Sequence, residues 1–245
     1  LDRSSAASDV YKRQGQRHER QRPARYPGAC PQRMMTMKKI ALILIAACAI
    51  SARAGGLESL ESFVRTVKTG KAEFTQVVTS PAKEGQAARS KTSSGSFEFA
   101  RPSRFKFVYK KPFEQTIVAD GQTLWLYDVD LNQVTARKQA QALGSTPAAL
   151  IAAAPDLKAL QADFALADAP DKDGLQWVQG TPKSKDSQLQ QVRVGFKQEQ
   201  LAVLEILDSF GQRSVLSFTG FQSNATLDAA AFQFKPPAGA DVVRQ

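Results

Sequence analysis

Apolar and polar residues alternate along most of the chain after residue 70, which is the pattern of β-strands with one buried face. Breaks at Pro102, at Pro112 and at the pair Asp120-Gly121 divide this stretch into neighbouring strands, because these residues favour turns. The predicted strands are residues 72–80, 95–101, 103–109, 114–120, 122–130, 133–138, 162–169, 175–182, 187–197, 200–209 and 213–222. The pattern therefore predicts an antiparallel sheet of about 10–11 strands, with residues 81–95 as a long hairpin loop.

Helical patterns interrupt the alternation. Residues 57–69 carry apolar side chains at helical spacing, which predicts an amphipathic N-terminal helix ended by Gly70. Residues 142–164 predict two short helices, the first begun by Thr146 and Pro147 and the second capped by Asp156. We expect one more helical turn near residues 228–231. The chain is thus predicted to be mainly β, with an N-terminal helix and a helical insert.

Some central strands are apolar on both faces. In residues 123–128, Trp125 and Tyr127 point to one side of the sheet while Leu124 and Leu126 point to the other. Residues 201–207 show the same two-sided pattern. A strand with one face in water carries polar residues on that face, so both faces of these strands must be covered.

The helical insert offers few large side chains with which to cover the apolar face of such a sheet, because Leu150 and Ile151 are the only large apolar residues between 144 and 154. A curved sheet with an under-filled apolar concavity and a light helical cover would explain this, and such concavities hold apolar ligands. A well-packed sandwich core with an incidental helical connection explains the pattern equally well.

Residues 37–54 have the three parts of a secretory signal peptide. Two lysines precede an apolar run over residues 40–50, and the small-residue site Ala52-Arg53-Ala54 follows it. The run is too short to cross a bilayer as a helix. We expect cleavage after Ala54, which leaves residues 55–245 as one domain, and we expect residues 1–36 to be an upstream or non-native extension without a fold. Cys48 offers an alternative, because "IAAC" (45–48) resembles the site at which bacterial lipoproteins are lipidated.

Removal of the leader changes the chemistry of the chain. Residues 1–54 hold 11 of the 33 basic residues but only 3 of the 23 acidic ones, so the formal net charge falls from +10 to about +2. The single His and both Cys residues also lie before residue 55. The remaining chain cannot form a disulfide, a Ser-His-Asp triad or one of the usual zinc sites, and nothing in it indicates an enzyme or a cofactor.

The stretch "FARPSRFKFVY" (99–109) interleaves aromatic with basic side chains. Rings beside cations suit a surface for single-stranded nucleic acid, but they also suit a strand with one apolar and one wet face. Affinity for nucleic acid depends largely on neutralising phosphates, which a nearly neutral domain does poorly. We therefore interpret this stretch as a strand and expect no nucleic-acid partner.

Three motifs follow one another in the sequence: RPxxFxxxYxxP at 101–112, IVxDGxTLWxYD at 117–128 and TPxxLI at 146–151. Together with the helical start at 57–76 and the closing "FQFKPP" (232–237), they resemble the periplasmic outer-membrane lipoprotein carrier proteins, the LolA family, over residues 55–245. The resemblance implies an unclosed half-barrel with a lid of short helices. It also implies a soluble, monomeric periplasmic carrier of the Gram-negative type, which takes acylated lipoproteins from an inner-membrane ABC transporter to an outer-membrane receptor.

The resemblance further implies roles for particular residues. Arg101 would latch the lid through a backbone carbonyl near Ile151, and Phe105 would lie at the mouth, where partners engage. Residues expected to contact the acyl chains are Phe97, Phe99, Phe105, Phe107, Tyr109, Ile117, Trp125, Tyr127, Leu150 and Ile151. Two alternatives stay open: a lipid-sensing or lipoprotein-sensing regulatory module of similar fold, and an anchored outer-membrane acceptor that would require a lipidated Cys48.

Overall fold

The computed structural model describes residues 55–82, 85–142 and 154–245. The predicted extension, the signal peptide and the first helix of the insert, with Leu150 and Ile151, lie outside these residues.

One twelve-stranded sheet dominates the described part of the chain, in the order β12-β6-β5-β4-β3-β2-β1-β11-β10-β9-β8-β7. The strands are β1 (Thr69–Ser80), β2 (Arg89–Ala100), β3 (Arg104–Lys111), β4 (Gln115–Ala119), β5 (Thr123–Asp128), β6 (Gln133–Lys138), β7 (Phe164–Lys172), β8 (Leu175–Pro182), β9 (Leu189–Lys197), β10 (Gln200–Asp208), β11 (Arg213–Ser223) and β12 (Asp241–Arg244). All neighbours are antiparallel except β12, which runs parallel to β6. Strands β7 and β12 end the order without pairing with each other, so the predicted unclosed, mainly antiparallel sheet is confirmed.

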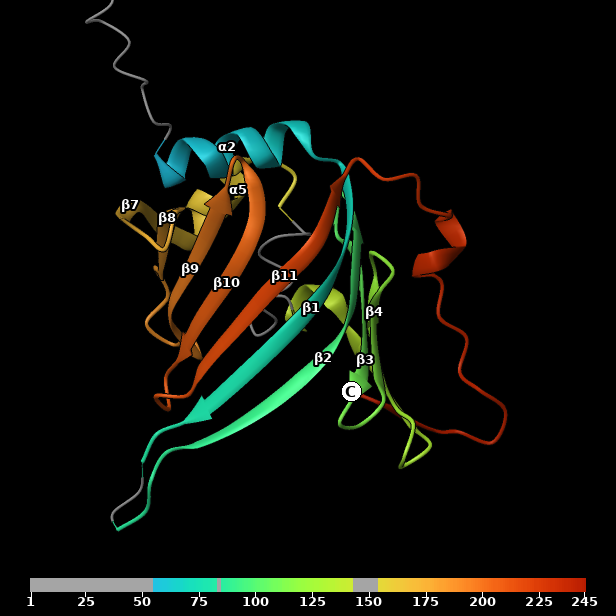
Figure 1. Cartoon of the computed structure of the whole chain (residues 1–245). Helices are drawn as coiled ribbons and strands as arrows, with labels where there is room; N and C mark the ends of the chain where they lie inside the picture. The colour runs from blue at the N-terminus through green and yellow to red at the C-terminus, as the bar shows by residue number, and fades with distance from the viewer. Residues whose placement is uncertain (1–54, 83–84, 143–153) are drawn as a thin grey trace, which may run out of the picture. The chain divides into compact units, whose positions relative to one another are not determined.

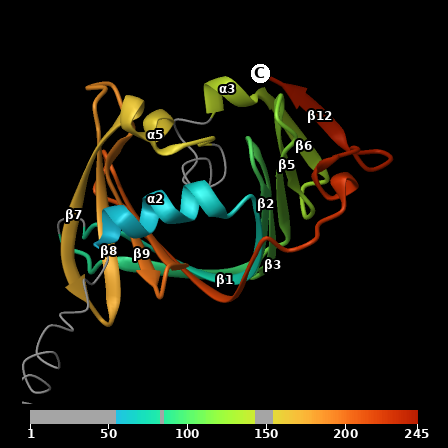
Figure 2. The ribbon, with the colours of Figure 1, turned by 90° about the horizontal axis from the view of Figure 1, so that it is seen from above.

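The sheet curves around helix α2 (Gly56–Thr66), which lies inside the concavity with α5 (Leu157–Asp163) beside it (Figures 1 and 2). Leu60, Phe63 and Val64 of α2 are buried against the sheet, as the helical spacing of apolar residues predicts. Gly55 has no side chain with which to cap α2, and the carboxylate of Asp168 on β7 accepts the hydrogen bond of the Leu57 N–H instead. We call the side of the sheet that faces α2 the concave face and the other side the convex face.

Two short helical elements accompany the sheet at other places. Helix α3 (Gln139–Ala142) follows β6 directly, and the 3₁₀ turn η2 (Ala229–Phe232) lies in the C-terminal segment. Asp156 caps α5 by accepting from the Ala159 N–H, and Asp228 caps η2 by accepting from the Ala230 N–H. The predicted cap at Asp156 and the predicted helical turn near residues 228–231 are thus confirmed.

The prediction that Gly70 ends the first helix is wrong. The helix ends at Thr66 because Val67 already adopts an extended backbone, and Gly70 lies within β1, opposite Phe99 and Ser223.

The structure also contains more strand than the alternation predicts. Strand β2 begins at Arg89, so the hairpin loop is shorter than residues 81–95, and its polar start pairs in continuous register with β1 up to Ser80. Pairing of the backbone maintains a strand here although neither face is apolar. The twelfth strand, β12, has only four residues and no pattern of its own, and it forms by pairing with β6, which lies more than 100 residues earlier.

Candidate functional site

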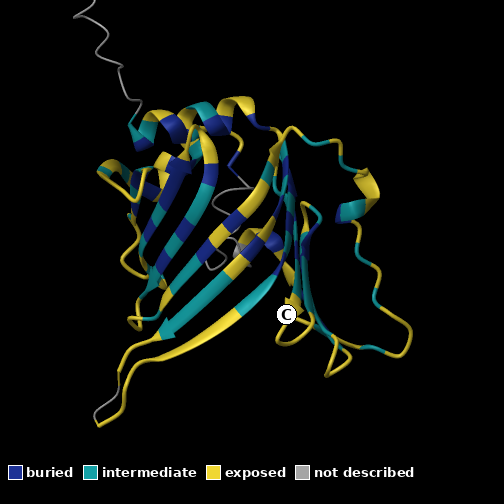
Figure 3. Ribbon diagram, viewed as in Figure 1, coloured by how far each residue is buried: buried dark blue, intermediate teal, exposed yellow. Residues whose placement is uncertain are grey.

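The buried residues of the sheet gather at the end nearest α2 (Figure 3), and apolar side chains form a cluster there on the concave face. Cross-strand pairing aligns them in two rows, because residues opposite each other in the register point to the same side of the sheet. The first row is Phe99, Phe105, Ala119 and Leu124, and the second is Phe97, Phe107, Ile117 and Leu126. We call these two rows the apolar half of the concave face.

The rings of the apolar half pack against one another and against α2. Phe97 and Phe107 lie 4.4 Å apart between ring centroids, and Phe63 of α2 lies 6.1 Å from Phe99. Phe97, Phe99 and Phe105 are fully buried, whereas Ile117 is half-buried. The expected lining residues on β2, β3 and β4 are therefore brought together on one apolar surface, and this surface is packed rather than open.

Trp125 and Tyr127, which were expected to contact acyl chains, lie on the convex face. They share that face with Val118 and Val134, their cross-strand partners, and the C-terminal Phe234 packs on them with ring centroids 5.5 and 6.2 Å away. Their placement as lining is thus wrong, because alternation separates the two faces of β5 without saying which one is concave. Leu124 and Leu126 occupy the concave face instead.

Phe105 does not lie at an exposed mouth. Its ring is 0% exposed and packs edge-on against Phe107 at 6.3 Å. The expected contact with a partner would require this end of the sheet to open, and it stays a prediction.

Arg101 lies in the turn between β2 and β3, beside the first row of the apolar half. Its Nε donates a hydrogen bond of 2.9 Å to the carbonyl of Val67, just after α2. Its Nη1 donates one of 2.6 Å to the carbonyl of Ala154, on the approach to α5. The side chain thus joins three parts of the chain that are distant in sequence. The carbonyl that it binds is that of Ala154, three residues after Ile151, which itself lies outside the described residues.

The surroundings of this guanidinium are apolar. Its central carbon lies 5.5 Å from the ring centroid of Phe63 and 5.3 Å from that of Phe99, so it contacts two aromatic faces. Burial lowers the pKa of Arg101 to about 10, which still leaves it charged at neutral pH. Its Nη2 is buried and has no hydrogen-bond partner among the described residues. Arg101 is a charge that is largely withdrawn from water and held by two carbonyl oxygens.

Gln139, which the sequence analysis missed, fixes the turn that carries Arg101. Its side chain is 2% exposed; its amide NH₂ donates to the carbonyl of Ser103, and its amide oxygen accepts from Gly121 N–H at 2.9 Å. Asp120 organises the neighbouring turn by accepting from Thr123 N–H and from the Trp125 indole. A lone Gln after a strand carries no sequence signal for such a role, since its partners are backbone groups from two other turns.

Comparison with known proteins identifies the family. The sequence model described as outer membrane lipoprotein carrier protein LolA matches residues 65–235, which is more than half of the chain. The chain belongs to the LolA family. It is 75% identical over 213 residues to the outer-membrane lipoprotein carrier protein of Albidiferax ferrireducens, a match that covers 85% of this chain and 100% of that protein. It is 51% identical over 211 residues to the protein of the same name from Methylibium petroleiphilum, covering 86% and 100%.

Likeness to solved structures is weaker. A LolA superfamily protein from Nitrosomonas europaea is 12% identical, with a TM-score of 0.41 over 74% of this chain and 98% of that one. A similarity at this level carries no argument about function.

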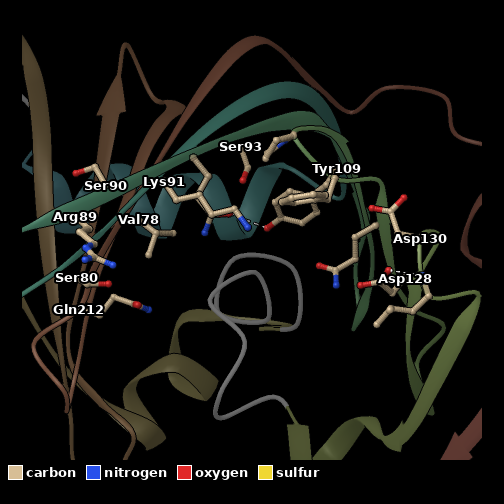
Figure 4. Close-up of a pocket in the computed structure, with 15 residues that line it drawn as sticks. Val78, Ser80, Arg89, Ser90, Lys91, Ser93, Tyr109, Asp128, Asp130 and Gln212 are labelled. Atoms are coloured by element: carbon tan, nitrogen blue, oxygen red, sulfur yellow. Dashed lines mark hydrogen bonds between the residues drawn. The ribbon is translucent and has the colours of Figure 1, made fainter.

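In this LolA family member, the end of the concave face farther from α2 is polar. A cavity of about 670 Å³ lies there, lined by side chains from β1 and β2 and by the loops after β3, β5 and β10 (Figure 4). Tyr109 marks its boundary: the ring packs edge-on against Phe74 at 5.0 Å, while the hydroxyl donates to the Gln76 side-chain oxygen at 3.0 Å. Burial raises the pKa of Tyr109 to about 12, so the hydroxyl stays neutral. Tyr109 therefore adjoins the apolar half with its ring and the cavity with its hydroxyl.

Other kinds of site find no support in the residues that the structure describes. Over residues 55–82, 85–142 and 154–245, no group of three or more His, Cys, Asp or Glu side chains could hold a metal ion. Among the same residues, no helix has the length and apolarity needed to cross a bilayer.

Proposed function

We propose that this chain is a soluble carrier that shields the acyl chains of lipoproteins with the apolar half of its concave face. It would take lipoproteins from an inner-membrane ABC transporter and deliver them to an outer-membrane receptor, crossing the periplasm as a monomer. The observation that carries the proposal is the pair of apolar rows, four of whose members are phenylalanines, on the concave face of an unclosed sheet. The names of its closely similar relatives support it.

The cost of exposing acyl chains explains why such a surface is needed. Burial of one CH₂ group contributes about 0.8 kcal/mol, so a chain of ~16 carbons costs roughly 12 kcal/mol to place in water. A carrier must offset most of this cost and still release its cargo. Because Phe97, Phe99, Phe105 and Phe107 are packed in the structure, acyl chains would gain access to this surface only after the apolar half opens.

We assign to Arg101 the role of a latch in that opening. It binds Val67 on the side of α2 and Ala154 on the side of α5, so one side chain ties the approach to α5 to the turn beside the aromatic rows. A hydrogen bond between a charged and a neutral group contributes about 1.5–3 kcal/mol, which is weak enough for a partner or an entering chain to break.

The test of the carrier function is capture of cargo by the purified protein. Incubated with membranes that contain the transporter and a tagged lipoprotein, the carrier should co-purify with the acylated lipoprotein but not with the same lipoprotein lacking its acyl chains. Equal recovery of both forms would refute binding through acyl chains. Release that does not respond to the transporter would instead favour a sensing module.

The maturation of the chain is a separate part of the proposal. We propose that cleavage after Ala54 yields the domain 55–245, with the signal at 37–54 removed. Mass spectrometry of the exported protein should find Gly55 at the N-terminus, whereas an N-terminal lipidated Cys48 would refute a soluble carrier.

A further inference from the structure

The concave face changes character along the strands at Tyr109. On one side lie the two apolar rows, and on the other the inward positions of β1 and β2 are Gln76, Ser93, Lys91 and Arg89, with Val78 as the apolar exception. Gln115 and Asp128 continue the polar surface on β4 and β5. Two chemically different halves thus lie on one surface.

The charges of the polar half lie on opposite walls of the cavity. Figure 4 shows Arg89 and Lys91 on one side and Asp128 and Asp130 on the other. Among the described residues, none of these four forms an ion pair with another side chain of the protein. Phe113 and Leu131 add apolar side chains to the rim of the cavity. A hydrocarbon chain laid against the charged and amide groups of the strands would displace water from groups that it cannot hydrogen-bond, so that part of the cavity disfavours acyl chains. Groups that both donate and accept hydrogen bonds fit it instead.

We propose that this cavity binds the polar part of the cargo, which is the first few residues of the polypeptide attached to the acylated cysteine. The proposal rests on the proposed carrier function, which places the acyl chains on the apolar half. Chains lying there would bring their point of attachment to the level of Tyr109, and the polypeptide would then continue along the strands into the cavity. An extended peptide offers N–H and C=O groups in alternation, which the uncharged side chains Ser93 and Gln115 can satisfy.

Two probes share the dioctanoylglyceryl group and differ in whether a peptide is attached to it, so they distinguish binding at this cavity from binding at the apolar half. One is dioctanoylglycerol, and the other is a pentapeptide whose N-terminal cysteine carries the dioctanoylglyceryl group on sulfur. Calorimetric titration of the protein of residues 55–245 should give a dissociation constant for the lipopeptide about tenfold lower than for dioctanoylglycerol, or about 1.4 kcal/mol.

The variant Ser93→Val/Gln115→Val makes this part of the lining apolar, and valine is a residue that is favoured in β-strands. Neither side chain has a hydrogen-bond partner among the described residues, so the fold should survive, which a thermal melt checks. The control Ser96→Val/Thr116→Val changes the same two strands on the convex face. We expect the first variant to lose the tenfold preference for the lipopeptide while its affinity for dioctanoylglycerol stays within about twofold, and the control to keep the preference.

The outcomes separate the two proposals. If the wild type binds neither probe, the carrier function fails, and this inference fails with it. If the wild type binds both probes but the Ser93→Val/Gln115→Val variant prefers the lipopeptide over dioctanoylglycerol to the same degree as the wild type, the peptide lies elsewhere. In that case only this inference is refuted. Tighter binding of both probes by that variant would mean that the cavity takes hydrocarbon, and it would refute the inference too.

Discussion

Replacement of Arg101 with Leu removes a side chain that joins Val67 to Ala154 through hydrogen bonds. Leu retains apolar bulk beside Phe63 and Phe99, so the fold should survive. Two effects oppose each other in its stability: two hydrogen bonds are lost, but a cation no longer has to be buried. We therefore expect only a small change in melting temperature, and the informative effect is on cargo.

The size of that effect follows from linkage. If Arg101 is the latch proposed above, its bond to Ala154 stabilises the closed, empty form and is broken when cargo enters, so it opposes binding by its own free energy. At about 1.5–3 kcal/mol for a hydrogen bond to a charged group, its loss alone would tighten cargo binding roughly 10- to 150-fold, and the relief of burying the cation reduces this gain. Arg101→Leu is thus expected to load lipoprotein well and release it poorly.

The assay is the dissociation rate of a fluorescent acylated peptide from the purified protein, followed by transfer of lipoprotein to the outer-membrane receptor. The matched control is Arg104→Leu, which removes another arginine that contacts an aromatic ring, in this case Phe232 at 5.7 Å, without any bond to Ala154. If Arg101→Leu releases and transfers cargo at the wild-type rate, or binds it more weakly, the latch is refuted.

Three further predictions concern the framework of the site. Trp125→Ala should destabilise the protein by about 2 kcal/mol in urea unfolding, because it removes the packing contact with Phe234 on the convex face. The affinity for dioctanoylglycerol should be unchanged, and a loss of affinity would indicate that Trp125 contacts the acyl chains after all. Gln139→Leu should cost roughly 1–3 kcal/mol of unfolding free energy, since it removes the hydrogen bonds to the carbonyl of Ser103 and to the N–H of Gly121, and a cost near zero would contradict its role. Burial alone would raise the pKa of Asp120, but the hydrogen bonds that its carboxylate accepts outweigh this effect and lower the pKa below its ordinary value of 3.8. The ionised carboxylate therefore stabilises the fold fully above pH 3.8, and this stabilisation is lost as the pH falls through the lowered pKa. The melting temperature of Asp120→Asn should accordingly lie below that of the wild type at neutral pH and approach it as the pH is lowered well below 3.8, and a gap independent of pH would contradict this.

Local signals account for the parts of the fold that the sequence predicts well. Alternation locates every strand from β1 to β11, and the carboxylate of Asp156 marks the start of α5, because each of these features depends on residues a few positions apart. Strand β12 escapes this reasoning since its pairing with β6 is a contact across more than 100 residues.

The site was predicted in part for the same reason. Family motifs pointed to Arg101 and to the aromatic residues of β2 and β3, and the structure brings these residues together. Which face of β5 is concave depends on the curvature of the whole sheet, so Trp125 and Tyr127 were assigned to the wrong side. Gln139 was missed because its partners are backbone groups of two turns that only the folded chain brings near it.

A sheet that does not close keeps two edges on which another chain could add a strand. Strand β7 carries Pro170, Asp171 and Lys172 near its end, and β12 is only four residues long and begins and ends with Asp241 and Arg244. Proline, charges and shortness all hinder pairing between molecules. The sheet can therefore stay open at both edges without pairing with the edges of other copies of the protein.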